Sequence, residues 1–216
     1  STAHAGVDVP VPAGPHAVLA DAQGWLATFE FGEDLRPEAA DTVRALRGLG
    51  LEVRILSGDA EPAVRRVAQA LGLDDAQARG GCTPQDKLAF LRQAQQQGRK
   101  VVVVGDGLND APASAGAHVS FAFGQAVPLA QSQADFVLLG QRLDAVARTV
   151  ALARRTLRIV RQNLWWAVAY NVVSVPLAVA GYMPAWLAGL GMAASSLLVV
   201  GNAMRLVIPA GEKETV

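Results

Sequence analysis

The sequence predicts an α/β domain built on a parallel sheet, followed by a hairpin of two transmembrane helices. Strand-like and helix-like patterns alternate along the first two thirds of the chain, which favours a parallel sheet with helical crossovers. Val101–Val104 form an unbroken apolar run, typical of a strand that is covered on both faces. From Asn163 to Met204, 42 consecutive residues contain no charged side chain and no histidine.

The elements of the α/β part are expected in a regular order along the chain. Three helices each begin at a proline and end before a glycine, as helices often do. These helices are expected at 37–49, 62–71 and 84–97. Apolar alternation or apolar runs predict strands at 25–31, 52–56, 101–104, 118–123 and 135–139. A last helical pattern starts at Leu143 and continues without a glycine or proline toward the uncharged stretch.

The loop after the valine run carries two carboxylates four residues apart, Asp106 and Asp110. The carboxyl ends of strands in open α/β sheets face the ligand crevice, and Gly105 and Gly107 allow a close approach of the backbone to a ligand. Two carboxylates at such a point repel each other unless a cation lies between them, and hard oxygen ligands suit Mg²⁺. The alternative is a capped turn, with Asn109 or Asp110 as a helix N-cap.

Two further segments carry polar groups that suit a phosphate. Ser57–Asp59 follow an apolar strand, and the Ser57 hydroxyl with free backbone N–H groups could hold a phosphate oxygen, although Ser-Gly-Asp is more often an ordinary turn. Thr83 and Pro84 open a helix as N-cap and first helical residue. Lys87 then lies in the first turn, where the helix dipole disfavours a cation. It is either a solvated surface charge or a ligand for phosphate.

These motifs, in this order, resemble the phosphorylation domain of P-type ATPases, which has a haloacid-dehalogenase-like fold. The most specific of them is Gly-Asp-Gly-Leu-Asn-Asp-Ala-Pro at 105–112. The resemblance implies ATP as substrate, Mg²⁺ held by Asp106, and Asp110 supporting that site. It places Asp59 near the hinge or the nucleotide. Around the phosphoryl group it places Ser57, Gly58, Lys87 and Asn109. Ser57 stands where most of the family has threonine, but the hydroxyl is kept.

The family's phosphorylated aspartate, in Asp-Lys-Thr-Gly-Thr, does not occur in this sequence. Phosphoryl transfer needs its nucleophile, so this chain alone is expected not to turn over ATP. Residues 16–53 resemble the return of the chain from the family's inserted nucleotide-binding domain. The expected domains are therefore the end of that insertion at 1–32, the phosphorylation domain at 33–145, a stalk helix with the last two transmembrane helices at 146–210, and a cytoplasmic tail at 211–216.

The uncharged stretch is long enough for two membrane crossings, since one crossing needs about 20 apolar residues. Glycine, proline and aromatic residues at 181–186 suit a turn at the membrane interface. Arginines lie before the first crossing and after the second but not between them, which predicts that both outer ends are cytoplasmic. The resemblance places the chain in the bacterial inner membrane as a multi-pass protein. The alternative is a buried helical hairpin of a soluble protein.

Polar and sulfur-containing side chains in the two crossings resemble the copper(I)-exporting branch of the heavy-metal P-type ATPases. The resemblance rests on Tyr-Asn at 170–171 and Met-x-x-Ser-Ser at 192–196. It assigns Tyr170, Asn171, Met192 and Ser196 to the path of Cu⁺, with Ser195 as second choice. A thioether suits a soft monovalent ion, whereas branches that move Zn²⁺ or Co²⁺ place an acid, lysine or histidine in these helices. Each of these residues taken alone is more often a packing residue.

Several alternatives remain open at this point. The chain could belong to a pump for another heavy metal, to a membrane-tethered phosphatase of the haloacid-dehalogenase type, or to a non-catalytic membrane protein with a relic domain. Segments such as "LSGD" and "SSLLVVGNAMRL" resemble the subgroup that supplies copper for assembly of cbb3-type cytochrome oxidase. The resemblance implies a copper ion, ATP, the lipid bilayer and a copper chaperone as partners, and no nucleic acid. The single cysteine, Cys82, excludes an internal disulfide.

Overall fold

The computed structural model describes residues 16–21, 24–30, 34–105, 110–124, 132, 134–140 and 142–207. The chain forms two compact units, residues 1–146 and residues 147–216, and each is described by itself. Of the predicted site residues, Asp106 and Asn109 lie outside the described residues.

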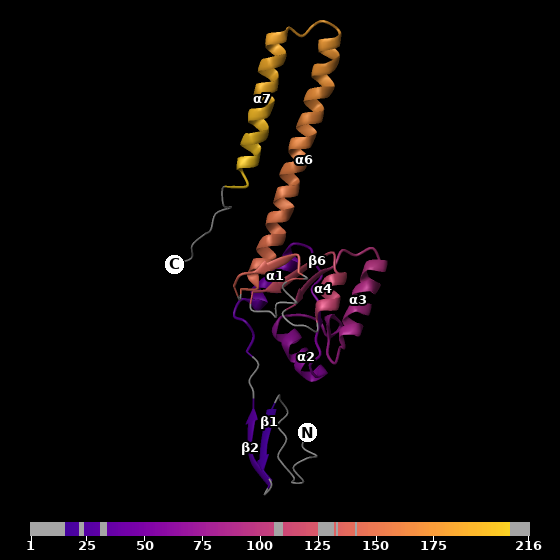
Figure 1. Cartoon of the computed structure of the whole chain (residues 1–216), viewed down its shortest axis with the longest axis vertical. Helices are drawn as coiled ribbons and strands as arrows, with labels where there is room; N and C mark the ends of the chain where they lie inside the picture. Colours follow the sequence, from indigo (N-terminus) through magenta and orange to yellow (C-terminus); the bar gives the residue numbers. More distant parts are fainter. Residues whose placement is uncertain are drawn as a thin grey trace. The chain divides into compact units, whose positions relative to one another are not determined.

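The first unit contains the alternating strands and helices that the sequence predicts (Figure 1). In chain order they are β1 (His16–Asp21), β2 (Gly24–Glu30), α1 (Ala39–Gly48), β3 (Ile55–Leu56), α2 (Glu61–Ala70), the 3-10 helix η2 (Asp75–Gln77), β4 (Ala78–Arg79), α3 (Pro84–Gln96), β5 (Val102–Gly105), α4 (Ala111–Gly116), β6 (Val119–Phe123) and β7 (Phe136–Leu138). The predicted helices are confirmed to within two residues at each end. The strand predicted at 52–56 is shorter, because only Ile55 and Leu56 form a ladder, with β4.

The strands from β3 to β7 pair in parallel, but not in one sheet. β3 pairs with β4, and β5–β6–β7 form a separate parallel sheet, while β1 and β2 form an antiparallel hairpin. Among the described strands, β3 and β5 each pair on one side only. The prediction that the valine run is covered on both faces is wrong for one face, since Val102 and Val104 are 41% and 38% exposed.

Two groups of apolar side chains form the core of this unit. One packs α1 and α2 against the segment that leads into β4, through Val43, Val64, Ala68, Leu73 and Ala78. The other surrounds β6, where the ring of Phe121 stacks on Phe136 of β7 with centroids 5.0 Å apart. Burial of these side chains is the main favourable term in folding, and it fixes the loops at the strand ends in place.

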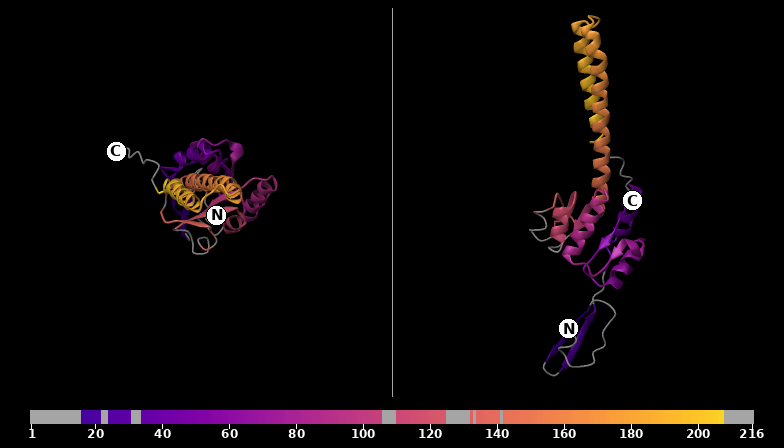
Figure 2. Two further views of the ribbon diagram at one scale, coloured as in Figure 1. Left: turned by 90° about the horizontal axis from the view of Figure 1, so that it is seen from above. Right: turned by 90° about the vertical axis from the view of Figure 1, so that its right-hand side faces the viewer.

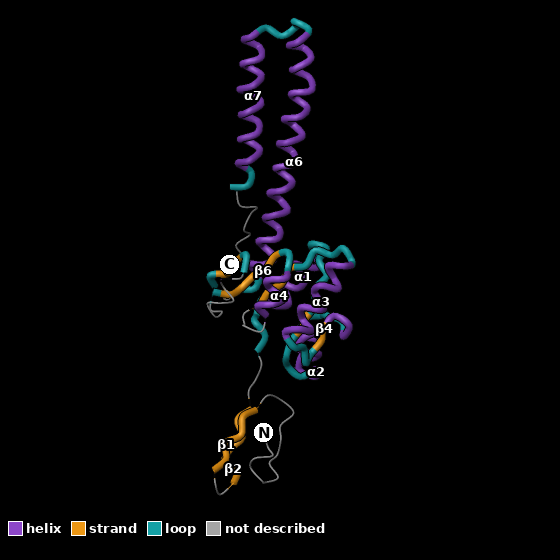
Figure 3. The backbone as a smooth tube through the Cα atoms, turned by 45° about the vertical axis from the view of Figure 1, so that its right-hand side comes forward, coloured by secondary structure: helices purple, strands orange, loops and turns teal. Residues whose placement is uncertain are grey.

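The second unit is a helical hairpin. α6 (Asp144–Val179) begins in the first unit and continues as one helix of 36 residues, and α7 (Ala185–Met204) runs alongside its C-terminal part (Figures 1 and 2). The tube drawing shows both as unbroken helices joined by a short connection (Figure 3). Gly181 has a φ of +79°, the left-handed conformation with which glycine often ends a helix.

Of the described helices, α7 alone is long and apolar enough by composition to cross a membrane. The C-terminal part of α6 is less apolar than α7, because it also contains polar and aromatic side chains. The predicted hairpin is therefore present, and the insertion of both helices into a bilayer stays a prediction.

Candidate functional site

Lys87 and Asp110 form the ion pair at the centre of the candidate phosphate site. The Lys87 ammonium donates to Asp110 Oδ1 over 2.7 Å, and the two side chains are 13% and 22% exposed. Lys87 is thus a partly buried cation with a specific partner, which argues against a solvated surface charge. Asp110 is the N-cap residue of α4, but its side chain makes no capping hydrogen bond. Its carboxylate is directed to Lys87 instead.

The start of α3 determines where Lys87 lies. The Thr83 hydroxyl accepts from the backbone N–H of Asp86 at 3.1 Å, and the Asp86 carboxylate accepts from the backbone N–H of Thr83 at 2.9 Å. This reciprocal capping box fixes the first turn of the helix, and Pro84 begins the helix as predicted. The hydroxyl of Thr83, together with its backbone N–H, keeps the pKa of Asp86 below its usual value. Asp86 was not singled out from the sequence, although Thr-x-x-Asp is a recognisable signal.

Gly105 allows Asp110 to approach the end of β5. A Cβ atom at position 105 would lie 2.8 Å from Asp110 Cβ and 2.9 Å from Asp110 Oδ2, closer than such atoms approach each other. The glycine in the predicted loop is therefore needed for the packing of a carboxylate against the strand end. From the sequence, Gly105 was expected only to let the backbone approach a ligand closely, and the structure adds this steric reason.

Ser57 and Asp59 form a second polar pair at the end of β3. The Ser57 hydroxyl donates to Asp59 Oδ2 over 2.6 Å, and the Asp59 N–H donates back to Ser57 Oγ over 3.2 Å. The backbone of Ser57 is bonded to Arg79 and Cys82, which ties this loop to the segment before α3. A Cβ atom at Gly58 would lie 3.5 Å from the Cys82 carbonyl oxygen, an ordinary contact, so sterics alone do not require glycine there.

Glu61 is a residue of this site that the sequence analysis missed. Its carboxylate accepts from the Gly80 N–H at 2.6 Å, and this bond, with Arg65 nearby, lowers the pKa of Glu61. A Cβ atom at Gly80 would lie 2.6 Å from the Cα atom of Glu61, so the first turn of α2 packs directly on this backbone. An acid directly before Pro62 in the first helical turn was the available signal.

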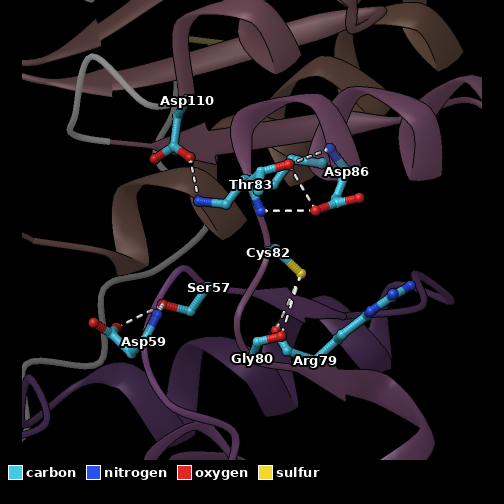
Figure 4. Close-up of polar contacts among 9 residues, drawn as sticks. Ser57, Asp59, Arg79, Gly80, Cys82, Thr83, Asp86 and Asp110 are labelled. Carbon is cyan, nitrogen blue, oxygen red and sulfur yellow. Dashed lines mark hydrogen bonds and ion pairs between the residues drawn. The ribbon is translucent and has the colours of Figure 1, made fainter.

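The structure thus brings the predicted residues together in two pairs (Figure 4). Lys87 with Asp110 is one, and Ser57 with Asp59 is the other; within the described part of the chain no hydrogen bond joins the two pairs. Residues 79–83 connect them. The described residues contain no group of three or more His, Cys, Asp or Glu that could hold a metal ion. The oxygen of Asp110 at a strand end does suit Mg²⁺, but its predicted partner Asp106 lies outside the described residues.

The residues predicted for the ion path divide between two faces of the hairpin. Tyr170 lies between the helices, where its hydroxyl is 3.5 Å from the Ala188 carbonyl oxygen. A Cβ atom at Gly191 would lie 3.0 Å from the same Tyr170 hydroxyl. Asn171 is exposed and donates to the Ala167 carbonyl of its own helix over 2.8 Å. Met192 and Ser196 are exposed on α7. The hairpin alone does not join these four side chains in one described polar contact.

Ser195, the second choice for the ion path, makes a hydrogen bond across the hairpin. Its hydroxyl accepts a hydrogen bond from the indole N–H of Trp166 at 3.1 Å, across the two helices. Ser196, the next residue of α7, is exposed, and its place on the ion path stays a prediction.

A second set of polar side chains joins the helices near the ends of the uncharged stretch, and it was not predicted. The Asn202 amide donates to Asn163 Oδ1 over 2.8 Å and to Gln162 Oε1 over 3.3 Å, and its oxygen accepts from Arg205 at 3.1 Å. Polar pairing of this kind fixes the register of helices in an apolar medium. The signal was the position of Asn163 and Asn202 close to the two limits of the uncharged stretch.

Comparison with protein families is consistent with this geometry. Residues 5–118, more than half of the chain, match the family described as haloacid dehalogenase-like hydrolase. The chain belongs to this family. Its haloacid dehalogenase-like unit carries both polar pairs, while the helical hairpin lies outside the matched residues.

This haloacid dehalogenase-like chain is similar to proteins described as transporting ATPases and to a nitrogen fixation protein. It is 44% identical to the nitrogen fixation protein FixI of Rhizobium leguminosarum, over 84% of this chain and 24% of FixI. It is 43% identical to the probable copper-transporting ATPase SynA of Synechococcus elongatus, over 87% of this chain and 25% of SynA. A zinc-transporting PIB-type ATPase in its E2.Pi state superposes with a TM-score of 0.73 and 32% identity, over 85% of this chain and 29% of that one. The chain therefore spans about a quarter of the length of the relatives it matches.

Proposed function

We propose that the chain is the C-terminal piece of a copper(I)-exporting P-type ATPase, with part of the phosphate site and half of the ion path. The observation that carries the proposal is the Lys87–Asp110 pair, a partly buried cation and carboxylate at the end of β5. The same chain contains an uncharged stretch at 163–204 that includes Tyr170 and Met192. The likeness to SynA, described as a probable copper-transporting ATPase, supports it.

In this function the residues of the first unit bind and orient a phosphoryl group. The Lys87 ammonium offers its remaining N–H donors to phosphate oxygens, while Asp110 keeps it at the strand end. The Ser57 hydroxyl, now bonded to Asp59, can donate to a phosphate oxygen instead after a rotation about χ1. Mg²⁺, when held by Asp106 and Asp110, would neutralise developing charge on the phosphoryl oxygens. The nucleophile comes from another segment, since this sequence has no Asp-Lys-Thr-Gly-Thr.

Copper(I) is the cargo that the hairpin suits best. A divalent ion in an apolar medium favours a carboxylate or another charged ligand, and residues 163–204 contain none. Met192 and Ser196 lie four residues apart and share one face of α7, which is exposed and so open to ligands from other segments. The likeness to a zinc-transporting ATPase does not select zinc, because the fold is shared and the ion is chosen by side chains.

Placement and partners belong to the same proposal. Both ends of the hairpin are cytoplasmic at the inner membrane, since the arginines flank the hairpin and avoid its turn. A copper chaperone is the source of the ion, and cbb3-type oxidase assembly is its use, on the basis of the subgroup resemblance in "SSLLVVGNAMRL".

A membrane-tethered phosphatase is the second candidate. The specific observation in its favour is the family match itself, which covers hydrolases and includes the Ser57–Asp59 and Lys87 segments. Such an enzyme would hydrolyse a phosphate ester without any dependence on a transported metal, so metal stimulation separates the two functions.

The test uses the complete protein, including the segments that precede this chain, reconstituted in lipid. ATP hydrolysis should be stimulated by Cu⁺ and not by Zn²⁺. Met192→Leu should lose the Cu⁺ stimulation because a soft ligand is removed at nearly constant volume. Met204→Leu, on the same helix, is the matched control and should keep it. Stimulation by Zn²⁺ alone would contradict the copper assignment, and metal-independent phosphate release would favour the phosphatase.

A further inference from the structure

A groove with a basic end and an aromatic end runs along α6 in the second unit. It has a volume of about 840 Å³. Its lining residues are Arg154, Leu157, Arg158, Arg161, Gln162, Trp165, Trp166 and Ala169. The spacing of the arginines at i, i+4 and i+7 puts their side chains on one face of the helix. The tryptophans follow one turn later, where the uncharged stretch has begun.

Two arginines of this groove, Arg158 and Arg161, have no acidic partner among the described residues. Arg158 and Arg161 are exposed, and neither forms a hydrogen bond or an ion pair with any residue in the described part of the chain. The sequence has no Asp or Glu from Ala145 to Gly211, so the surrounding helix cannot neutralise them. Arg161 is two residues from the start of the uncharged stretch at Asn163. Within the described part of the chain no acid pairs with these two arginines, so this position is open to an anion near the start of the uncharged stretch.

The chemistry of the groove suits an amphiphile with a phosphate head. Guanidinium groups bind phosphate oxygens in pairs of parallel hydrogen bonds. Tryptophan is enriched at the level of lipid headgroups, where its ring lies in the apolar region and its N–H in the polar one. Leu157 and Ala169 provide apolar floor for an acyl chain. A soluble anion would use the arginines but would gain nothing from the tryptophan end.

We propose that this groove binds the phosphate of an anionic phospholipid from the cytoplasmic leaflet, with Arg158 and Arg161 on the headgroup and Trp165 beside the acyl chain. The inference rests on the proposed insertion of the hairpin into the bilayer and is independent of the transported ion. Bound lipid neutralises the two arginines and fixes the depth at which α6 enters the membrane.

Tryptophan fluorescence in nanodiscs tests the proposal on the full chain. Trp25→Phe and Trp186→Phe leave Trp165 and Trp166 as the only tryptophans of the sequence. The chain is placed in nanodiscs of phosphatidylcholine with a minority of phosphatidylglycerol, and either lipid carries bromine on its acyl chains as a quencher. Brominated phosphatidylglycerol should quench far more than its mole fraction predicts, and brominated phosphatidylcholine should quench in proportion to its own.

Paired arginine variants show whether the groove causes the preference. A basic residue near an anionic surface contributes about fivefold to binding, so Arg158→Gln with Arg161→Gln should reduce the preference by about 25-fold. The matched control is Arg66→Gln with Arg92→Gln, two exposed arginines of the first unit that remove the same charge. The control should keep the full preference.

The outcomes separate the inference from the proposed function. Equal quenching by the two lipids, or an equal loss in both double variants, overturns the lipid site alone. No quenching by either lipid contradicts the insertion of the hairpin and the lipid site with it. Loss of the preference in inorganic phosphate, but not in sodium chloride of equal ionic strength, would assign the groove to free phosphate and overturn the lipid. The comparison of lipids in the unsubstituted groove stands even if the arginine variant fails to fold.

Discussion

The haloacid dehalogenase-like unit and the helical hairpin hold their polar groups in different ways. In the first unit, charged side chains pair with each other or with backbone N–H groups at the ends of elements, as Lys87 does with Asp110 and Glu61 with Gly80. In the hairpin, neutral amides and an indole join two helices, as Asn202 does with Asn163. The first unit is solvated at its edges and can keep ions, whereas an apolar medium makes an unpaired ion costly.

The largest expected effect tests the charged pair of the first unit. In the complete protein, Asp110→Asn removes the charge opposite Lys87 and the predicted support for Mg²⁺. Formation of the phosphorylated protein from ATP should fall by about 100-fold or more, as for other preorganised charges at reacting centres. Asp75→Asn, an exposed acid in η2, is the control and should leave it unchanged. Wild-type phosphorylation in the Asp110 variant would show that the pair is only structural.

A smaller effect is expected from the packing behind that pair. Gly105→Ala would place a methyl group 2.8 Å from Asp110 Cβ, so the carboxylate must move. Overpacking of this kind typically destabilises by about 1–3 kcal/mol. Gly48→Ala is the matched change, since a Cβ atom there meets nothing within 4 Å and glycine is the weaker helix former. Thermal unfolding of the chain in detergent should show a lower Tm for the first variant only, and a lower Tm for both would remove the steric explanation.

The next effect concerns the neutral network of the hairpin. Asn202→Leu removes the hydrogen bonds to Asn163 and Gln162, and such bonds between membrane helices contribute about 0.6 kcal/mol on average. Asn171→Leu should change helix association less, because the bond of the Asn171 amide among the described residues is to the Ala167 carbonyl of its own helix. Cysteine cross-linking between α6 and α7 in lipid measures the association. If the two variants separate the helices equally, the cross-helix amide has no special role.

The smallest expected effect is that low pH destabilises the first unit and leaves the hairpin folded. The backbone N–H of Gly80 lowers the pKa of Glu61, and that of Leu143 lowers the pKa of Glu38. With folded pKa values below the unfolded ones, these carboxylates stabilise the fold fully above about pH 4.5. That contribution is lost as the pH falls through the lowered pKa values. The first unit should therefore lose near-UV circular dichroism in acid, while the hairpin, with no acid from Ala145 to Gly211, keeps its helicity. Parallel loss in both units would mean that the carboxylates are not the cause.

The sequence by itself determined the local structure and the kinds of chemistry. Prolines and glycines predicted the ends of α1, α2 and α3, because they restrict or free the backbone of their own residue whatever surrounds them. Thr83 as N-cap is confirmed for the same local reason. The order of motifs identified the haloacid dehalogenase-like family, and the uncharged stretch predicted the helical hairpin.

Only the tertiary structure decided which side chains meet. Lys87 and Asp110 are 23 residues apart, and the sequence did not show that they pair with each other. The sequence also did not predict that the parallel strands separate into two sheets. Nor did it predict that Val102 and Val104 are exposed, because a run of valines indicates a strand but does not show which elements pack on it. Ser195 and Ser196 are equivalent hydroxyls in the sequence, but the position of Trp166 across the hairpin gives Ser195 a hydrogen-bond donor from α6. Periodicity fixes the face of one element, while a contact between elements depends on how the whole chain packs.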